Sequence, residues 1–281
     1  MFLLAPFQFD FMWRALIGSV AVGVLAALLG VFVVLRGMSF IGEGLAHGSL
    51  GGLALAYALG WNLYAFGSVY TVGLALLIAW IGRRRRTRMD TAVGIVFSGS
   101  LALGVLLIST IKWYTTDLSA YLFGDVLALR TQDLVAVVVV LFLVTGFMLL
   151  FYRRMVFLSF DPEGAQATGL PTTWLNNAFL ALIGIGVVAA MQTVGVILVT
   201  ALLVIPAATA WQVARSMVQM TAIAVAVALV SALVGLYASY YLNVASGASI
   251  VLAAAFIYGL VSLVSGRRVG WRRSLGMGAR G

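Results

Sequence analysis

Long, nearly uninterrupted runs of apolar residues recur along the whole chain and leave little choice of fold. Nine of them approach or exceed the roughly 20 residues that a helix needs to cross the hydrocarbon core of a membrane. They cover residues 11–35, 38–60, 62–82, 91–111, 134–152, 173–191, 194–214, 218–242 and 246–265. In lipid, a spanning segment must satisfy its own backbone amides, which a helix does. The sequence therefore predicts an all-α, polytopic bundle of about nine transmembrane helices.

The amino-acid composition supports lipid as the solvent for most of the chain. Of the 281 residues, 63% are hydrophobic and 9% are charged, whereas a soluble domain carries about 25% charged residues. No segment is polar enough to be a soluble domain. We therefore expect residues 1–281 to form a single integral membrane domain, with a basic tail at residues 266–281.

The net charge of +9 comes almost entirely from arginines at the ends of the apolar runs. They lie at Arg36, residues 83–88, Arg153, Arg154, Arg215 and residues 267–273. In a soluble protein this charge would suggest a nucleic-acid partner, but basic residues in short loops set the orientation of membrane proteins. Nine crossings bring every basic cluster to the cytoplasmic side, with the N-terminus outside and the C-terminus inside. We therefore interpret the arginines as orientation signals and expect no nucleic-acid partner.

Two ionisable residues lie inside the second apolar run, where burial is costly. Glu43 and His47, the only histidine of the chain, are four residues apart and therefore project from one face of a helix. Ionisable groups within a membrane usually mark an ion pathway. A carboxylate and an imidazole, in a chain without cysteine, suit Zn²⁺, Mn²⁺ or Fe²⁺. We predict a metal site at Glu43 and His47; the alternative is a carboxylate–imidazole hydrogen bond that only holds helices together.

One glutamate and one histidine cannot complete a tetrahedral metal site. Two copies of the chain that face each other across a twofold axis would supply two carboxylates and two imidazoles. The pair therefore predicts a homodimer in which Glu43 and His47 meet their counterparts. The metal would be transported cargo, and we expect no permanently bound cofactor.

A short polar segment between the fifth and sixth runs predicts a small helix on the arginine-rich side. Its marker residues are Asp161, Pro162, Glu163, Gly164, Ala165 and Gly169. Asp161 suits a helix N-cap, Pro162 the first helical position, and Glu163 the first turn. Gly169 is then suited to end the helix. We expect about two helical turns presented to the cytoplasm.

The chain contains no nucleotide-binding loop of the form G-x-x-x-x-G-K-[ST], and its single lysine, Lys112, lacks a glycine-rich lead-in. It is therefore not expected to be an enzyme that hydrolyses nucleotide. Transport would be driven by a separate ATPase, be driven by an ion gradient, or be passive. The main alternative to an ATPase-driven importer is a secondary carrier that uses Glu43 and His47 as a proton and metal relay.

Four segments resemble the zinc/manganese-type permeases of ABC transporters. Residues 36–47 resemble the motif R-x-x-S-F-x-G-[DE]-x-L-x-H of that family, and residues 194–210 are similarly specific. Residues 91–98 and 117–124 carry weaker similarity. The resemblance extends from about residue 11 to residue 265 and so covers nearly the whole chain.

The resemblance implies a type II-importer-like permease of the bacterial inner membrane that carries zinc or manganese into the cytoplasm. Such permeases are homodimers; each copy pairs with a cytoplasmic ATPase subunit, and an extracytoplasmic metal-binding protein delivers the ion. The resemblance makes Glu43 and His47 the intramembrane metal site, although the family more often has aspartate at the first position. It makes residues 161–169 the coupling helix that docks on the ATPase.

Overall fold

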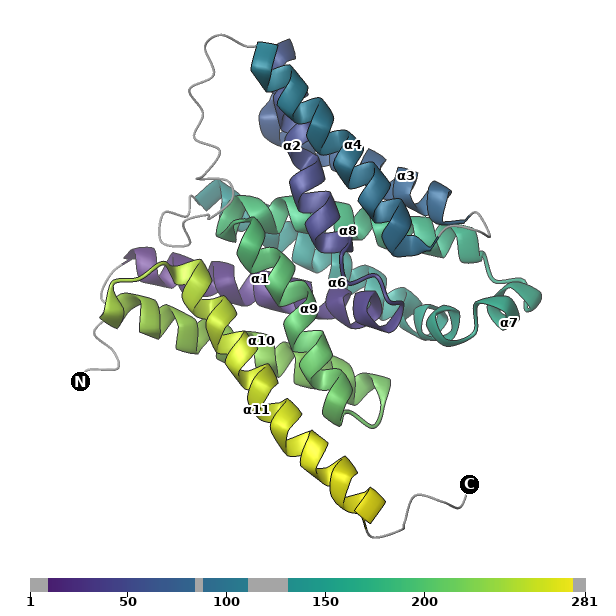
Figure 1. The fold of residues 1–281 in the computed structure, drawn as a ribbon. Helices are drawn as coiled ribbons and strands as arrows, with labels where there is room; N and C mark the ends of the chain where they lie inside the picture. The colour runs from purple at the N-terminus through teal and green to yellow at the C-terminus, as the bar shows by residue number, and fades with distance from the viewer. Residues whose placement is uncertain (1–9, 84–87, 111–130, 275–281) are drawn as a thin grey trace.

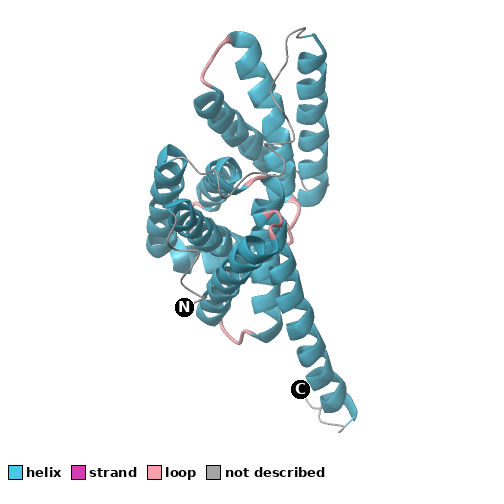
Figure 2. Ribbon diagram, turned by 90° about the vertical axis from the view of Figure 1, so that its left-hand side faces the viewer, coloured by secondary structure: helices cyan, strands magenta, loops and turns pink. Residues whose placement is uncertain are grey.

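The computed structural model describes residues 10–83, 88–110 and 131–274. Throughout these ranges the regular elements are α-helices, without a strand, which confirms the predicted all-α class (Figures 1 and 2). They are, in chain order, α1 (Asp10–Leu35), α2 (Ile41–Leu59), α3 (Leu63–Gly82), α4 (Met89–Thr110), α6 (Thr131–Phe160), α7 (Pro162–Ala167), α8 (Thr172–Val194), α9 (Val196–Val213), α10 (Met217–Leu242) and α11 (Ser246–Ser274). The family-like segment at residues 117–124 and the end of the basic tail, residues 275–281, lie outside the described ranges.

Each of the nine predicted apolar runs corresponds to one long helix. Within the described ranges, eight of these helices are long and apolar enough to cross a membrane. The ninth is α2, which has 19 residues and includes Glu43, His47 and 5 glycines. The helix that carries the predicted metal ligands is therefore also the one whose composition suits bare lipid least well.

Two helices continue beyond their predicted ends: α6 reaches Phe160, where the sequence predicted residue 152, and α11 reaches Ser274, where it predicted residue 265. Arg153 and Arg154 do not end the helix, because arginine is a good helix former. The guanidinium of Arg154 lies over an aromatic face, with its Cζ 5.7 Å from the centre of the Phe151 ring. Consequently α6 runs without interruption to the segment that leads into α7.

Helices α1 and α8 form the centre of the bundle and have the most buried spans. Helix α1 packs against α6, α9 and α10, while α8 packs against α3 and α6. A close approach in this centre depends on Gly30 of α1, where a side chain would run into the backbone carbonyl of Leu203 on α9. Small residues at such crossings let helix backbones pack closely in lipid.

Large apolar side chains cover the outside of the bundle. Leu149 and Phe142 on α6 are 79% and 72% exposed, and Leu252 and Phe256 on α11 are 69% and 68% exposed. Apolar surface of this kind is rare on soluble proteins but suits a lipid-facing surface. The structure therefore agrees with the multi-pass membrane protein that the apolar runs predict.

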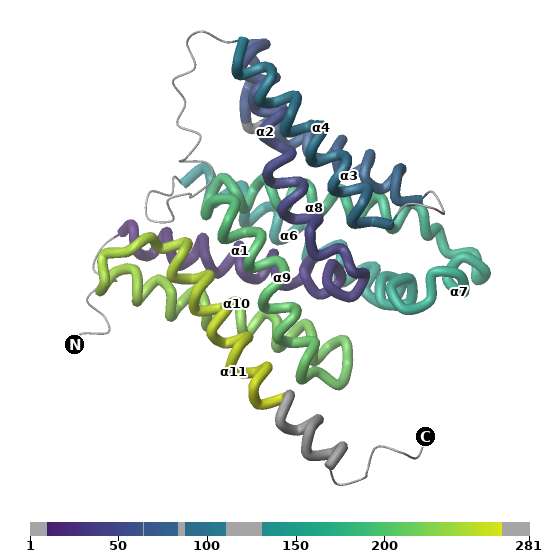
Figure 3. The backbone as a smooth tube through the Cα atoms, viewed as in Figure 1, coloured from purple at the N-terminus to yellow at the C-terminus, as the bar shows by residue number. Residues whose placement is uncertain are grey.

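Helices α2, α3 and α4 form one group, which lies at the opposite side of the bundle from α10 and α11 (Figures 1 and 3). In both views α1 runs from left to right. The α1–α2 turn, α7 and the α9–α10 loop lie toward the right, whereas the start of α1 and the α10–α11 loop lie on the left. The α1–α2 turn and α7 thus share one end of the bundle.

Candidate metal site

Glu43 and His47 lie on the outward face of α2. Glu43 is exposed and His47 is half-buried, whereas Gly42, Gly44 and Ala46 between and beside them are buried. Glu43 is in the first turn of α2, where the positive end of the helix dipole favours a carboxylate. The two predicted ligands are therefore available on the surface of a single chain and share one face, as their spacing predicts.

The imidazole of His47 is held in a defined orientation by its own helix. Its Nδ1 lies 3.2 Å from the backbone carbonyl oxygen of Glu43. A carbonyl oxygen only accepts hydrogen bonds, so Nδ1 carries the proton and Nε2 keeps its lone pair. Metal-binding histidines commonly use their second ring nitrogen in this way. The hydrogen bond lies within one helix and does not join the imidazole to the Glu43 carboxylate.

A tight contact with α4 supports the face that carries the two ligands. A side chain on Gly44 would overlap Cγ1 of Val93 on α4. One turn along, the ring of His47 meets the ring of Phe97 edge-on, with centroids 6.1 Å apart and an interplanar angle of 80°. The position of His47 is therefore set by the packing of α2 on α4.

A polar network at Gly48, the residue after His47, ties α2 to both neighbouring helices. The hydroxyl of Ser100 on α4 donates to the Gly48 carbonyl oxygen at 2.6 Å. The hydroxyl of Tyr70 on α3 lies 2.9 Å from Ser100 Oγ. Because the Ser100 proton is directed at Gly48, Tyr70 acts as the donor to Ser100. Neither residue was predicted from the sequence; the available signal was a serine within an apolar run that packs against a glycine-rich helix.

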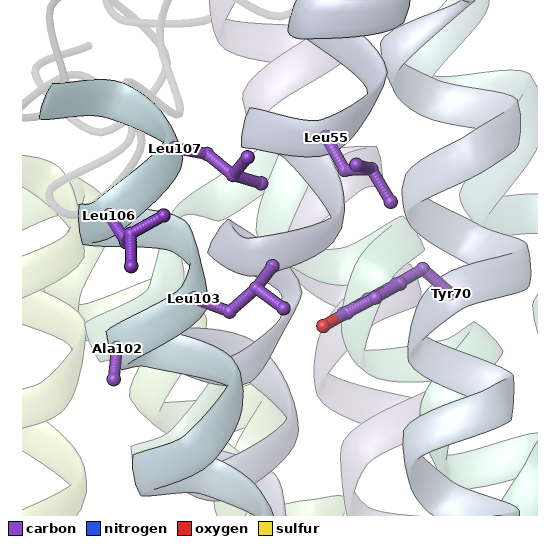
Figure 4. A pocket seen from close by; sticks show the side chains of 6 residues that line it. All are labelled: Leu55, Tyr70, Ala102, Leu103, Leu106 and Leu107. Atoms are coloured by element: carbon purple, nitrogen blue, oxygen red, sulfur yellow. The ribbon is translucent and has the colours of Figure 1, made fainter. Parts of the chain in front are cut away.

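Near this network, α2, α3 and α4 surround a hollow of about 380 Å³ (Figure 4). It is lined by Leu55, Tyr70, Ala102, Leu103, Leu106 and Leu107. The one polar side-chain group in this lining is the Tyr70 hydroxyl, which is engaged with Ser100. Hard and borderline divalent cations require oxygen or nitrogen ligands, so this hollow does not suit the ion.

The described part of one chain brings too few ligand side chains together to enclose a metal ion. Among the residues that the structure describes, no group of three or more His, Cys, Asp or Glu side chains could hold one. Helix α4, which packs against α2, exposes the small residues Gly94, Ser98 and Ala102 at four-residue intervals. Small residues at this spacing form a surface on which another membrane helix can pack closely.

The short helix α7 has the capping pattern that its sequence predicts. The Asp161 carboxylate accepts a hydrogen bond from the backbone N–H of Gly164 at 2.8 Å, and Pro162 occupies the start of the helix. The chain then turns at Gly169, which has a φ of +78°. Glu163 is exposed, while Ala165 is buried and anchors the helix. The segment is thus a short helix presented at the surface.

Arg36 differs from an exposed orientation signal. It is half-buried, and its Nε donates to Ser159 Oγ at 3.0 Å and its Nη1 to Asn176 Oδ1 at 3.1 Å. Its Cζ lies 4.8 Å from the centre of the Phe179 ring. Burial lowers the pKa of Arg36 to about 10, so the guanidinium remains charged at neutral pH. By contrast, Arg153 is exposed.

Comparison with known proteins gives consistent results. Residues 8–265 match the profile of the ABC 3 transport family. The manganese transport system membrane protein MntC of Listeria monocytogenes is 41% identical, over 92% of this chain and 92% of its own. The manganese import system permease protein ScaB of Streptococcus gordonii is 38% identical, over 89% of this chain and 90% of its own.

A third relative, a probable iron transport system membrane protein of Haemophilus influenzae, is 36% identical over 92% of this chain and 96% of its own. Among solved structures, PsaBC from Streptococcus pneumoniae in complex with Fab is similar with a TM-score of 0.80 and 35% sequence identity. That match covers 93% of this chain and 94% of the other.

Proposed function

The chain belongs to the ABC 3 transport family and is the membrane-spanning permease of a metal-ion importer, and on this premise we propose that its cargo is Mn²⁺, bound by Glu43 and His47. Two relatives are named for manganese transport and one for iron. Carboxylate oxygen suits Mn²⁺ and imidazole is shared among the first-row metals. Zn²⁺ is the main alternative, because the same donors also bind it.

The observation that carries this proposal is the orientation of His47 on the outward face of α2. Because Nδ1 donates its proton to a backbone carbonyl, Nε2 keeps a lone pair that can bind a metal without a change of tautomer. Glu43 lies one turn away on the same face and adds a carboxylate. Glutamate is one methylene longer than the aspartate more usual in this family, so its carboxylate reaches further from the helix axis.

The site is completed by a second copy of the chain. Glu43 is exposed in the single chain, and among the described residues too few other ligand side chains gather near it to balance a buried cation. The exposed small residues of α4 beside it, Gly94, Ser98 and Ala102, allow a partner helix to approach closely. A homodimer with its axis near this face would place two carboxylates and two imidazoles around one ion.

The permease depends on other proteins for energy and for delivery of the ion. Its sequence lacks a nucleotide-binding loop, and an ABC permease works with a separate ATPase. We assign the end of the bundle that carries α7 to the cytoplasm, so that the N-terminus is outside and the C-terminus inside. Residues 161–169 then dock on the ATPase, and an extracytoplasmic metal-binding protein delivers the ion at the opposite face.

Reconstitution of the permease with its ATPase in liposomes tests the proposal. Wild-type protein should take up Mn²⁺ only when ATP is present on the ATPase side, and Zn²⁺ should compete. Glu43→Ala and His47→Ala should insert normally and lose uptake, because each removes one ligand from each half of the site. Wild-type uptake by either variant would overturn the assignment of the ligands. Uptake driven by a pH gradient without ATPase would instead support the secondary carrier.

A further inference from the structure

Arg36 connects three parts of the bundle that lie far apart in the sequence. It follows the last residue of α1 and precedes α2. Its guanidinium donates to Ser159 near the end of α6 and to Asn176 near the start of α8. We call these three residues, together with Phe179 beneath the guanidinium, the Arg36 clamp. Since α6 and α8 are the two helices that flank α7, the clamp contacts both supports of α7.

Both clamp contacts lie close to α7 along the chain, so we expect a displacement of α7 to reach the clamp. Ser159 lies two residues before the N-cap Asp161, and Asn176 lies in the first turns of the helix that follows α7. Ser159 Oγ donates to the Met155 carbonyl oxygen at 2.7 Å and uses a lone pair to accept from Arg36. The acceptor is therefore fixed to the backbone of α6.

On its other side, Arg36 is joined to α2 by a tight turn. Gly37 has a φ of +65°, and the backbone N–H of Met38 donates to the carbonyl oxygen of Val33 at 3.0 Å. The Met38 carbonyl oxygen in turn accepts from the N–H of Ile41, the first residue of α2, at 3.0 Å. Glu43 follows within the first turn of α2. The clamp thus lies a short, hydrogen-bonded distance from the metal-binding face.

Simple stabilisation does not account well for this arrangement. The partners that the structure gives Arg36 are a hydroxyl, an amide oxygen, a thioether sulfur and an aromatic ring, all of them neutral. Burial of a cation is costly without a charged partner, and apolar residues of similar size often stabilise a protein as well or better. An orientation signal would act equally well if exposed. The planar fork of arginine, however, can hold two acceptors at fixed relative positions, which lysine cannot do.

We propose that Arg36 is a positioning residue that transmits movement of α7 to the metal-binding helix α2. Movement imposed on α7 shifts Ser159 and Asn176, and the guanidinium passes this shift to the α1–α2 turn and so to Glu43 and His47. This inference rests on the proposed function. Arg36 contributes no metal ligand in this scheme. It links the energy of ATP hydrolysis to the geometry of the site, in the sense of a coupling free energy between two sites.

The test compares Arg36→Met with Arg153→Met in the full complex with its ATPase. Methionine keeps length and apolar packing but removes the charge and the donor fork. Arg153 is an exposed arginine on α6 and loses the same charge. Three quantities are measured: equilibrium binding of Mn²⁺, ATP hydrolysis, and ions transported per ATP in liposomes. For Arg36→Met we expect binding and hydrolysis within about twofold of wild type and ions per ATP lower by about tenfold, a typical size for allosteric coupling.

Several results would overturn the inference. Unchanged ions per ATP in Arg36→Met would do so, as would an equal loss in Arg153→Met or a parallel loss of Mn²⁺ binding. Ser159→Ala, which removes one acceptor and keeps the arginine, serves if Arg36→Met does not insert; unchanged ions per ATP there would also refute the clamp. A wrong cargo assignment can be told apart from a wrong role for Arg36, because the wild-type complex itself would then not transport Mn²⁺. In that case ions transported per ATP are compared between variants and wild type with Zn²⁺ as the cargo.

Discussion

Replacing Gly44 by alanine tests whether the packing of α2 on α4 holds the proposed metal ligands, Glu43 and His47, in place. Gly44 follows Glu43, and an added Cβ overlaps Cγ1 of Val93 and lies 3.8 Å from Cβ of Phe97. Valine has one strongly preferred rotamer in a helix, so Val93 cannot turn away freely. The helices must separate by on the order of 1 Å to restore ordinary contact between carbon atoms.

Two opposing effects determine the change in stability. Overpacking of a close contact costs about 1–3 kcal/mol, while replacement of glycine by alanine within a helix gains about 0.5–1 kcal/mol. The expected net effect on the free energy of unfolding is a loss of about 1 kcal/mol, within a range of about 0–2.5 kcal/mol. The metal site should respond more strongly, because its ligands must stay within about 0.5 Å of their working positions. We expect Mn²⁺ affinity to fall about tenfold, which corresponds to about 1.4 kcal/mol.

Gly73→Ala provides the matched control. Gly73 lies on α3, is exposed, and has nothing within 4 Å of an added Cβ. Calorimetric titration of Mn²⁺ into both variants and wild type in one detergent measures affinity, and thermal unfolding measures stability. Gly73→Ala should match wild type in affinity. If Gly44→Ala binds Mn²⁺ as tightly as Gly73→Ala, the contact between α2 and α4 does not position the ligands and the reasoning fails.

Two further predictions concern the polar network on α2 and the cap of α7. Ser100→Ala leaves the Tyr70 hydroxyl without its acceptor and should lower the stability by about 1–3 kcal/mol in thermal unfolding. Asp161→Ala removes the cap of α7 and should weaken co-purification of the ATPase, since such a cap contributes about 0.5–2 kcal/mol. Wild-type values in any of these assays would contradict the corresponding assignment.

Features that depend on neighbours in the sequence could be predicted without a structure. The apolar runs are each long enough to identify a helix, because in lipid the backbone N–H and C=O groups must form their hydrogen bonds within the same segment. The spacing of Glu43 and His47 determines that they share a face. The start of α7 likewise follows from Asp161 and Pro162, whose preferences act within one helical turn.

The end of α6 shows where such local reasoning fails. Arg153 and Arg154 suggested a boundary, but a charged pair ends a helix only if the chain also loses its helical propensity, and here it does not. Arg36 was interpreted from its position at the end of an apolar run in the same way as the other arginines. Its burial depends on α6 and α8, which lie more than 110 residues away, as the separations of 123 to Ser159 and 140 to Asn176 show.

The sequence by itself determined that this chain is a helical membrane protein with one acid and one histidine on a shared helix face, because periodicity and hydrophobicity act over a few residues. Only the tertiary structure decided that Ser100 and Tyr70 tie α2 in place and that Arg36 joins both flanks of α7 to α2. Those features arise from side chains brought together by helix packing, and the partner of each contact is set by distance in space and not by distance along the chain.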